Sequence, residues 1–575
     1  MANSKAEKII PAIEWLKTYS FREFPGDLTA GIITAILLVP QAMAYSILAG
    51  LPPEVGLYAS IAPPILYAFF GSSRALAVGP VAVASLMVAS ALGNLALPGS
   101  TDYILAALVL SALIGLILLI MGIAKAGFLA NFLSHPVMSG FTSAAAIVIA
   151  FSQLKHLLGI DIPRGASVDE TILYILGHIT EANPTTLIIG TISLLLLFSL
   201  RKYLGPLLMR AGLPEGFANT LVKAGPMFVV VLMTSLSAQM LWDQTSGLVV
   251  VGHIPSGLPP LTIPSFDISV WRELAGSAAL IALVSFVESV AIAKVLASKR
   301  RQKIDVNQEL VGLGVANLGA AFTGGSPVCG GFSRSVVNFS AGANTQLAAI
   351  VTACLIALSV LFFTPLFYYL PQAVLAAIIT IAVLGLVDIK ALKINWIYSK
   401  SDAIAWLVTF AVVMVEGIEM GIIAGVIVSL ILFLWRSSKP HIAIVGRVGN
   451  SEHFRNVKRH NVRTCPHVLA IRVDESLFFA NTRYFENYVM SAVVDQPKVK
   501  HVIFICSAIN AIDGSALESL EQLVTDLKSA GVTFHLAEVK GPVMDRLEKT
   551  HFLEHLMPGK IFLSTHDAFR SLDCA

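Results

Sequence analysis

The chain has 575 residues, of which 56% are hydrophobic and only 13% are charged. A soluble domain carries about 25% charged residues, so this composition excludes an ordinary water-soluble enzyme, and it also excludes a disordered chain. The net charge of +3 is too small to indicate nucleic-acid binding. The recurring apolar runs favour many membrane helices and one small domain over several soluble domains.

The N-terminal segment, residues 1–25, is polar and amphipathic, unlike a cleavable signal peptide. We expect it to lie in the cytoplasm, and the chain to be inserted by its own spans. Acidic residues are then few until about residue 436, whereas the sequence after Lys439 is polar and mixed. This change predicts a membrane domain at 26–437 and a separate C-terminal domain at 438–575.

Apolar runs that could cross a bilayer, or part of it where a helix is broken, recur through the membrane domain. The sequence predicts spans at 27–47, 55–71, 78–93, 103–123, 130–153, 185–201, 224–241, 273–297, 308–323, 329–342, 345–365, 372–388, 403–417 and 419–435. These are 14 segments. The third and the tenth are notably short.

The distribution of Lys and Arg sets the orientation. With a cytoplasmic N-terminus, the outer loops would hold only Lys155, Arg164 and Arg272. The inner loops would hold Arg74, Lys125, Arg201, Lys202, Arg210, Lys223, Lys299, Arg300, Arg301, Lys303, Lys390, Lys393 and Lys400. The sequence therefore predicts a multi-pass protein of the plasma (inner) membrane whose N-terminus and C-terminal domain are both cytoplasmic.

The first short span begins Val78-Gly79-Pro80. Proline suits the first turn of a helix, and glycine lets a ligand approach the backbone. The N-terminus of a helix presents free N–H groups and a partial positive charge to an anion. A plain helix start with a packing glycine would explain this segment equally well.

The second short span begins Cys-Gly-Gly-Phe-Ser-Arg-Ser at residues 329–335. A charge inside a membrane segment costs about 2.5–3.5 kcal/mol on insertion scales, so Arg334 should face water, an anion or a carboxylate. The hydroxyl of Ser333 and the N-terminal amides can bind an oxyanion. The alternative is an arginine that snorkels or is paired structurally.

The two short spans are the third in each group of seven. In inverted-repeat transporters, interrupted spans at corresponding places in the two halves mark a binding site near the middle of the membrane. Two helix N-termini that point toward each other would form a positive focus, which selects an anion. We therefore expect the two segments to meet and to bind a negative solute.

Three further polar residues fall inside predicted spans. Gln41 and Tyr45 are four residues apart and share one face of the first span, where they could contact substrate oxygens or another helix.

Glu288 lies well inside the eighth span. A carboxylate in a low-dielectric cleft favours its protonated form unless a cation offsets this. Glu288 is therefore a candidate for proton coupling, with a fixed salt bridge to Arg334 as the alternative.

The C-terminal domain alternates strand and helix signals. Residues 468–473, 501–505 and 532–536 are predicted strands, and residues 517–527 have one apolar helical face, so a small α/β domain is expected. Asp513 is a natural N-cap for that helix, although its loop could also be a regulatory docking site.

The chain shows no enzyme signature: it has no P-loop, no HExxH and no nucleophile elbow. The cysteines show neither metal-ligand spacing nor a paired framework: Cys329, Cys354, Cys465, Cys506 and Cys574. We therefore expect no enzyme activity, no cofactor and no metal, and we expect transport to draw on an ion gradient or on exchange.

These motifs resemble the sulfate permease (SulP) family, bacterial relatives of solute carrier family 26 and prestin. The most specific stretch is AGLPPEVGLYAS at 49–60, followed by GSSR at 71–74 and by Val78-Gly79-Pro80; the turn at 332–335 fits as well. The tail resembles a STAS domain, similar to anti-sigma-factor antagonists. Gly514 stands where antagonists carry the phosphorylated serine, and Ser515 follows one position later, which argues against regulation by that mechanism.

The resemblance implies a 7+7 inverted repeat divided into core and gate domains, an elevator motion of the core, and a homodimer. It places the substrate between the third and tenth helices, with anion-contacting positions at Gln41, Tyr45, Val81, Ser333 and Arg334. Gly79, Pro80 and Phe332, from the two helix starts, complete the expected substrate-binding residues. Val81 departs from the aromatic residue of mammalian relatives, which implies a roomier pocket.

The expected function is secondary active transport of a small inorganic anion across the lipid bilayer, most directly proton-coupled sulfate uptake. The surroundings of Glu288 resemble carriers thought to use protons, whereas sodium-coupled bicarbonate members tend to carry Asp there. Some proton-coupled relatives have an acid in the first span, and this chain has none inside that span. Bicarbonate or dicarboxylate uptake, chloride/bicarbonate exchange, an anion channel and a voltage-responsive protein remain alternatives, as does a membrane-tethered signalling platform.

Overall fold

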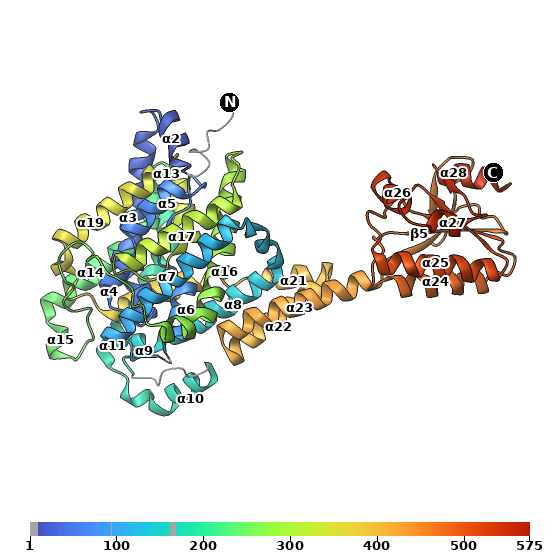
Figure 1. Ribbon diagram of the computed structural model, residues 1–575. Coiled ribbons are helices and arrows are strands. Elements are labelled where there is room, and N and C mark those ends of the chain that lie inside the picture. Colours follow the sequence, from blue (N-terminus) through green and yellow to red (C-terminus); the bar gives the residue numbers. More distant parts are fainter. Residues whose placement is uncertain (1–9, 94, 161–167, 575) are drawn as a thin grey trace. The chain divides into compact units, whose positions relative to one another are not determined.

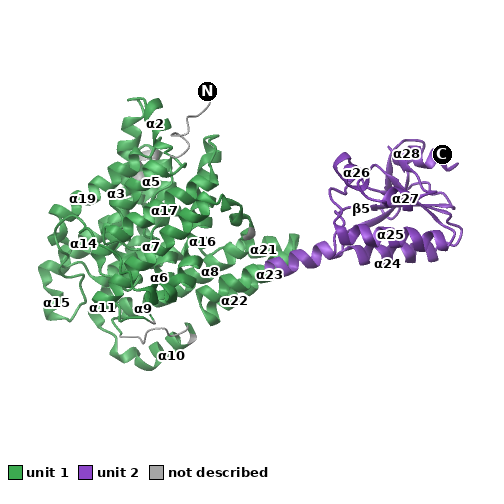
Figure 2. Cartoon of the chain, in the orientation of Figure 1, with its two compact units in different colours: residues 1–428 green, residues 429–575 purple. Residues whose placement is uncertain are grey.

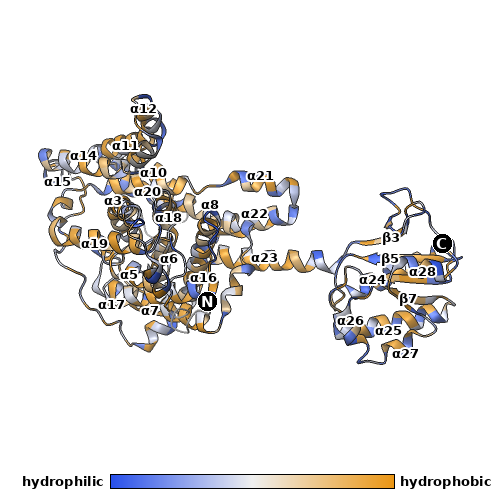
Figure 3. Ribbon diagram, turned by 90° about the horizontal axis from the view of Figure 1, so that it is seen from above, coloured by the Kyte–Doolittle hydropathy of each residue, from blue (hydrophilic) through white to orange (hydrophobic). Residues whose placement is uncertain are grey.

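The computed structural model describes residues 10–93, 95–160 and 168–574. The chain divides into two compact units, Met1–Val428 and Ser429–Ala575 (Figures 1 and 2). Apolar residues cover most helices of the first unit, whereas the second unit is mixed (Figure 3). The boundary between the two units, after Val428, falls within helix α23 (Ile418–Ser438), which begins before the change in composition at residue 438.

Helices long and apolar enough to cross a membrane number 7 among the described residues. They are α3 (Phe24–Leu48), α7 (Thr101–Ile123), α8 with α9 (His135–Leu158), α11 with α12 (Pro184–Arg210), α16 (Ile268–Lys299), α20 with α21 (Gln372–Tyr398) and α23. The other predicted spans coincide with shorter helices: α4 (Pro53–Tyr58), α5 (Ala62–Phe70), α6 (Ala82–Gly93), α14 (Gly225–Met240), α17 (Val306–Phe322), α18 (Phe332–Ser340), α19 (Leu347–Phe362) and α22 (Lys400–Glu416).

The predicted span 55–71 is not one helix. It breaks into α4 and α5, and Pro63 and Pro64 lie in the first turn of the second helix. A proline fits a helix start because its missing N–H has no partner there. The structure also contains helices that the sequence did not predict, among them α10 (Val168–His178) and α13 (Glu215–Lys223).

Contacts between helices link the whole first unit. Helix α17 packs against α5 and α7, α16 against α7, and α18 and α19 against α3. Helix α22 packs against α8, and α20 packs against α8, α11 and α3. Glycines permit the close crossing of α7 and α17, because a Cβ at Gly314 would lie 2.9 Å from the backbone N of Leu119.

The second unit contains a six-stranded sheet in the order β4-β3-β5-β6-β7-β8. Its strands are β3 (Ile442–Arg447), β4 (Phe454–Asn456), β5 (Val468–Val473), β6 (His501–Ile505), β7 (Thr533–Ala537) and β8 (Ile561–Phe562). Strands β5 to β8 run parallel, and β3 pairs antiparallel with both neighbours. The predicted strands and the α/β architecture are confirmed, whereas β3, β4 and β8 were not predicted.

Helices cover the sheet on both faces, with a separate apolar core for each. One core receives α24 (Thr482–Val494), α25 (Gly514–Ser529), α26 (Gly541–Leu547) and α27 (Phe552–Leu556), and the other receives α28 (Thr565–Ser571). Asp513 caps α25 as expected, because its carboxylate accepts the Ala516 N–H at 2.8 Å. It also accepts the Phe479 N–H at 2.9 Å, which ties the helix start to the loop before α24.

The expectation that the cysteines form no pair is wrong for Cys465 and Cys574. These residues are joined by a disulfide although 109 positions separate them in the sequence. Cys465 precedes β5 and Cys574 follows α28, so the sheet and the last helix bring together two residues that no local spacing connects. Cys329, Cys354 and Cys506 are free cysteines.

We expect the second unit to lose stability in mild acid because of His535 in β7. Nδ1 of this buried side chain accepts the Lys560 N–H at 3.1 Å, and Nε2 lies 3.1 Å from Nδ1 of His501. Burial, with the nearby charges of His501 and Lys560, lowers the pKa of His535 to about 4. An unfolded histidine has a pKa of about 6.5.

The unfolded chain therefore binds a proton that the folded unit resists, and stability falls as the pH drops from about 6.5 toward 4, by roughly 2–3 kcal/mol. Hydrogen–deuterium exchange of the β6 and β7 amides in the intact chain measures this loss. The variant His535→Asn should flatten the pH dependence, whereas the exposed His551→Gln should leave it unchanged. Equal pH dependence in all three proteins would refute this assignment.

Candidate anion-binding site

The two short segments meet in the first unit, as their sequences predict. Strand β1 (Val78–Gly79) pairs antiparallel with β2 (Cys329–Gly330), so that Val78 lies opposite Gly330 and Gly79 opposite Cys329. Helix α6 follows β1 and helix α18 follows β2. Because the paired strands run in opposite directions, the N-termini of the two helices come together from the two halves of the chain.

Hydrogen bonds between the two halves hold this crossing in place. The N–H of Gly331 donates to the carbonyl of Ala77 at 3.1 Å, and the N–H of Ala77 donates to the hydroxyl of Ser335 at 2.9 Å. The side chain of Asn338 in α18 donates to the Ala75 carbonyl at 3.1 Å. All of these groups are buried, so each bond is shielded from water.

Arg334 lies in the first turn of α18 and is only 2% exposed. Its Nη1 donates to the carbonyl of Pro80, just before α6. Nε and Nη2 are buried and have no hydrogen-bond partner among the described residues. These two nitrogens form one edge of the guanidinium, the edge that can bind two oxygens of an oxyanion side by side. A buried donor without a partner is costly, so this edge indicates a ligand.

Glycine backbone from both segments lies close to the guanidinium. A Cβ at Gly331 would lie 2.8 Å from Nη2 of Arg334. A Cβ at Gly79 would lie 3.4 Å from the same atom. Gly331 is also the N-cap of α18, and no side chain caps this helix. The first amides of α18 therefore remain available beside the guanidinium.

The remaining residues expected from the sequence lie around the two helix starts with different exposures. Pro80 and Gly79 are buried, Val81 is partly buried, and Phe332 and Ser333 are exposed. The hydroxyl of Ser333 makes no hydrogen bond within the part of the chain that the structure describes. The structure thus brings the backbone of both segments together around Arg334, while the first two side chains of α18 point away from the buried interior.

Helix α3 packs against both α6 and α18. It carries Gln41, which is 6% exposed, and Tyr45, which is 8% exposed. Tyr45 lies close enough to Arg334 and Glu288 to interact electrostatically with both. Neither side chain has a hydrogen-bond partner among the described residues. The phenol of Tyr45 therefore lies near the guanidinium and is available to a ligand, and Gln41 lies one turn earlier on the same helix.

Glu288 lies on α16, and the next residue, Ser289, contacts the site directly. The hydroxyl of Ser289 accepts the N–H of Gly330 at 2.8 Å. Glu288 interacts electrostatically with Arg334, but among the described residues no ion pair joins these two side chains. The fixed salt bridge considered from the sequence is therefore not formed. The carboxylate of Glu288 therefore lies near the site without an ion pair to Arg334.

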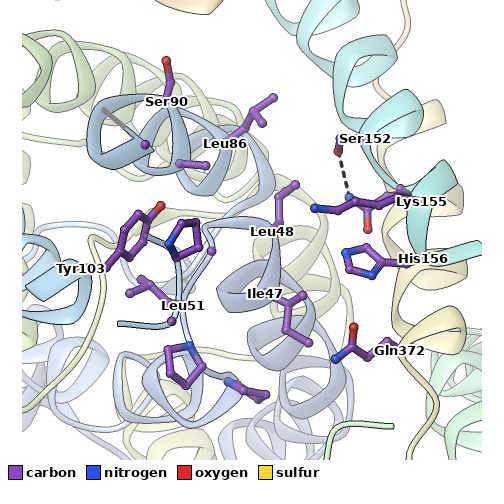
Figure 4. A pocket seen from close by; sticks show the side chains of 18 of the residues that line it. Ile47, Leu48, Leu51, Leu86, Ser90, Tyr103, Ser152, Lys155, His156 and Gln372 are labelled. Carbon is purple, nitrogen blue, oxygen red and sulfur yellow. Dashed lines mark hydrogen bonds between the residues drawn. The ribbon is translucent and has the colours of Figure 1, made fainter. Parts of the chain in front are cut away.

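A pocket of about 900 Å³ opens beside the C-terminal ends of α3 and α6 (Figure 4). Its lining includes Leu48 from α3 and Ser90 from α6, and Lys155 and His156 project toward it from α9. Gln41, Tyr45 and Arg334 do not line it. The pocket therefore shares the helices α3 and α6 with the site, but none of the expected substrate-binding residues lines it.

A family profile described as "Sulfate permease family" matches residues 24–409, which is more than half of the chain. The chain belongs to the sulfate permease family. A second profile, described as "STAS domain", matches residues 459–568 and thus covers most of the sheet of the second unit.

Curated relatives of this family member match almost its whole length. "Sulfate transporter 4.1, chloroplastic" of Arabidopsis thaliana is 36% identical over 98% of this chain and 82% of its own. "High affinity sulfate transporter 2" of Stylosanthes hamata is 32% identical over 97% of this chain and 86% of its own. This sulfate permease family member is therefore a multi-pass membrane transporter of anions.

Solved structures show the same fold. The structure of SLC26A9 superposes with a TM-score of 0.89 at 24% identity and covers 99% of this chain and 93% of that chain. The transmembrane domain of the cyanobacterial bicarbonate transporter BicA superposes with a TM-score of 0.59 at 23% identity, over 72% of this chain and 98% of that chain. The architecture expected from the family resemblance is thereby shown.

Two residues that support the site in this family member escaped sequence reasoning. Asn317 of α17 donates to the carbonyl of Val328 at 2.9 Å and accepts the N–H of Val328 at 3.0 Å, which fixes the backbone just before β2. Glu309, fully buried in the first turn of α17, fixes the loop before β1. The signal available for Glu309 was an acidic residue at the start of an otherwise apolar span.

Glu309 accepts four hydrogen bonds from the segment that leads to β1. The hydroxyl of Tyr67 donates at 2.6 Å, the hydroxyl of Ser72 at 2.7 Å, and the backbone N–H groups of Ser72 and Ser73 at 2.8 and 2.9 Å. We expect Glu309→Ala to cost about 3 kcal/mol or more of stability, because it leaves several buried donors without an acceptor. Thermal unfolding of the purified chain in detergent checks this, with the exposed Glu416→Ala as control. A melting temperature that matches the control would contradict this role.

Proposed function

We propose that this protein is a secondary active transporter that takes up sulfate, coupled to protons, by an elevator-type alternating-access mechanism. The observation that supports this most is the buried guanidinium of Arg334, whose Nε and Nη2 have no partner among the described residues. Two donors on one planar edge match two oxygens of a tetrahedral oxyanion. The names of the curated relatives, which are sulfate transporters, agree with this substrate.

Charge at the site favours an anion over a cation or a neutral solute. The starts of α6 and α18 add their partial positive charges to that of Arg334. Gln41 and Tyr45 can donate hydrogen bonds to the same ligand. Glu288 is the acidic residue beside this cluster, so a proton on Glu288 would make the site more positive and strengthen anion binding. Proton uptake and sulfate uptake would then favour each other.

The energetics limit the stoichiometry of such a carrier. Moving one elementary charge across a potential of 100 mV changes its free energy by about 2.3 kcal/mol. A dianion that enters a negative-inside cell must therefore overcome an electrical free-energy cost of roughly 4.6 kcal/mol. One proton offsets only half of this. Accumulation against the potential therefore needs a second cation, a pH gradient, a monovalent substrate or an exchanged anion.

The elevator proposal rests on how the site is held together. Its side chains and helix starts come from α3, α6, α16 and α18, and both α3 and α16 contact α6 and α18. If these four helices move as a body against the remaining helices, the site crosses the membrane with its ligand. We place the N-terminus and the STAS domain in the cytoplasm of a plasma (inner) membrane protein, and two copies in the assembly. Protease accessibility in right-side-out vesicles and light scattering in detergent test these two points.

Transport by purified protein in liposomes tests the proposed function. Radiolabelled sulfate, bicarbonate, fumarate and chloride would each be offered under an imposed proton or sodium gradient. We expect saturable sulfate uptake that an inward proton gradient drives and a sodium gradient does not. Uptake that follows sodium with bicarbonate, obligatory exchange with internal chloride, or conductance without saturation would each reject the proposal in favour of bicarbonate uptake, exchange or a channel.

A further inference from the structure

Three metal-ligating side chains converge at one edge of the STAS domain, far from Arg334 in the sequence. They are Cys465, His467 and Cys574, and each is partly buried. Sγ of Cys574 lies 3.2 Å from Nε2 of His467. Sγ of Cys465 lies 3.5 Å from each ring nitrogen of the same histidine. In this structure the two sulfurs are joined to each other, so the imidazole stands beside a closed disulfide.

The backbone holds all three residues in place. Cys465 forms a β-bridge with Val468, and the carbonyl of His467 accepts the N–H groups of Lys500 at 2.9 Å and His501 at 3.0 Å. The N–H of Cys574 donates to the carbonyl of Phe569 at the end of α28, also at 2.9 Å. The side chains therefore converge because the sheet and the last helix place them there, which is the preorganisation that a binding site needs.

We propose that the reduced chain binds one thiophilic divalent cation, zinc in the first instance, through the two sulfurs and one ring nitrogen of His467. Thiolates and imidazole are the donors that zinc prefers. Tetrahedral zinc with its usual bond lengths separates a sulfur ligand from a nitrogen ligand by roughly 3.5 Å. The separation of 3.5 Å between Sγ of Cys465 and Nδ1 of His467 fits this value, and the ligand atoms of the three residues all lie within 4.8 Å of one another.

The surroundings of His467 match those of a metal ligand. Nε2 lies 3.2 Å from the carbonyl of Leu572. If Nε2 carries the hydrogen and donates it to this carbonyl, Nδ1 presents its lone pair to the ion. Ligating histidines commonly donate their other ring N–H to a carbonyl in this manner. Solvent fills the fourth position of the tetrahedron.

The disulfide is the metal-free, oxidised state of the same site. A small-molecule disulfide RSSR accepts two electrons from the two thiolates: one S–S bond forms between Cys465 and Cys574, the S–S bond of RSSR breaks to give two RS⁻, and the ion leaves. The two states exclude each other because a sulfur that forms the disulfide is no longer a thiolate and cannot bind the metal ion. A reducing compartment favours the dithiol, and hence the metal.

Cobalt binding to the full-length chain tests this proposal. The protein is purified in detergent, reduced with a phosphine, stripped with a chelator and titrated with Co²⁺. We expect one ion per chain, a thiolate-to-cobalt charge-transfer band, and displacement of cobalt by Zn²⁺. Cys465→Ser and Cys574→Ser should remove the band, and His467→Gln should weaken binding at least tenfold. The matched control is Cys354→Ser, because Cys354 is an exposed free cysteine outside the cluster.

A second measurement needs no variant. In the wild-type chain, zinc should protect Cys465 and Cys574 from alkylation, as read by peptide mass spectrometry, while Cys354 stays reactive. The oxidised chain should bind no cobalt until it is reduced. A reduced chain without the charge-transfer band, a band that persists in Cys465→Ser, or alkylation that zinc does not slow would each overturn the proposal.

Discussion

Replacing Arg334 with glutamine should abolish sulfate uptake. The substitution removes the positive charge and the guanidinium edge formed by Nε and Nη2, both of which lack a partner among the described residues. Each hydrogen bond to a charged group contributes about 1.5–3 kcal/mol, so losing two should lower affinity at least about 100-fold. Sulfate binding by isothermal calorimetry and uptake into liposomes both measure this loss.

Arg334→Lys separates charge from shape. Lysine keeps the positive charge but cannot present two parallel N–H groups, so we expect partial binding and much slower uptake. Arg210→Gln is the control, because Arg210 is exposed at the end of α12. If Arg334→Gln folds normally and still takes up sulfate at the wild-type rate, the anion does not bind at this guanidinium.

Replacing Glu288 with glutamine should uncouple uptake from the proton gradient while leaving sulfate binding intact. Glutamine has nearly the same shape but cannot exchange a proton. Because Glu288 interacts electrostatically with Arg334, removing its charge should keep sulfate affinity the same or raise it. Uptake should then no longer increase when the outside is made acidic. The measurement is initial sulfate uptake against external pH, together with binding at one pH.

The control for this experiment lies on the same helix. Glu273→Gln changes an exposed glutamate near the start of α16 and should leave the pH dependence unchanged. An uptake profile for Glu288→Gln that rises in acid as the wild-type profile does would exclude coupling through this residue. Loss of binding as well as uptake would instead place Glu288 in the structural support of the site.

The meeting of the two short segments could be predicted from the sequence because the signals for it are local. Glycine, proline and an intramembrane arginine interrupt two apolar runs at corresponding positions, and the structure joins them as β1 and β2. Sequence reasoning failed where the partner is distant. Glu309 is 242 positions from Tyr67, and 109 positions separate Cys465 from Cys574. No periodicity or spacing connects such residues, because the connection exists only after the helices and strands have packed.

The prediction of a single span at 55–71 was wrong because it overlooked a local signal. The run 55–71 was taken as one span on hydropathy, although Pro63 and Pro64 occur within it. Proline inside a helical pattern commonly marks a boundary, and α5 indeed begins just before this pair. Hydropathy reports whether a segment is apolar, whereas the break depends on backbone hydrogen bonds that proline cannot make.

The pairing of β1 with β2 limits how the two helix starts can move relative to each other. Main-chain bonds tie one half of the duplicated architecture to the other, so α6 and α18 cannot slide apart without breaking them. Any movement that exposes a bound anion to either side of the membrane must then move both helix N-termini together. If the anion binds at the proposed site, it would keep the same donors throughout its passage. Under the proposed proton coupling, release on the two sides would then differ through water access and through the protonation of Glu288.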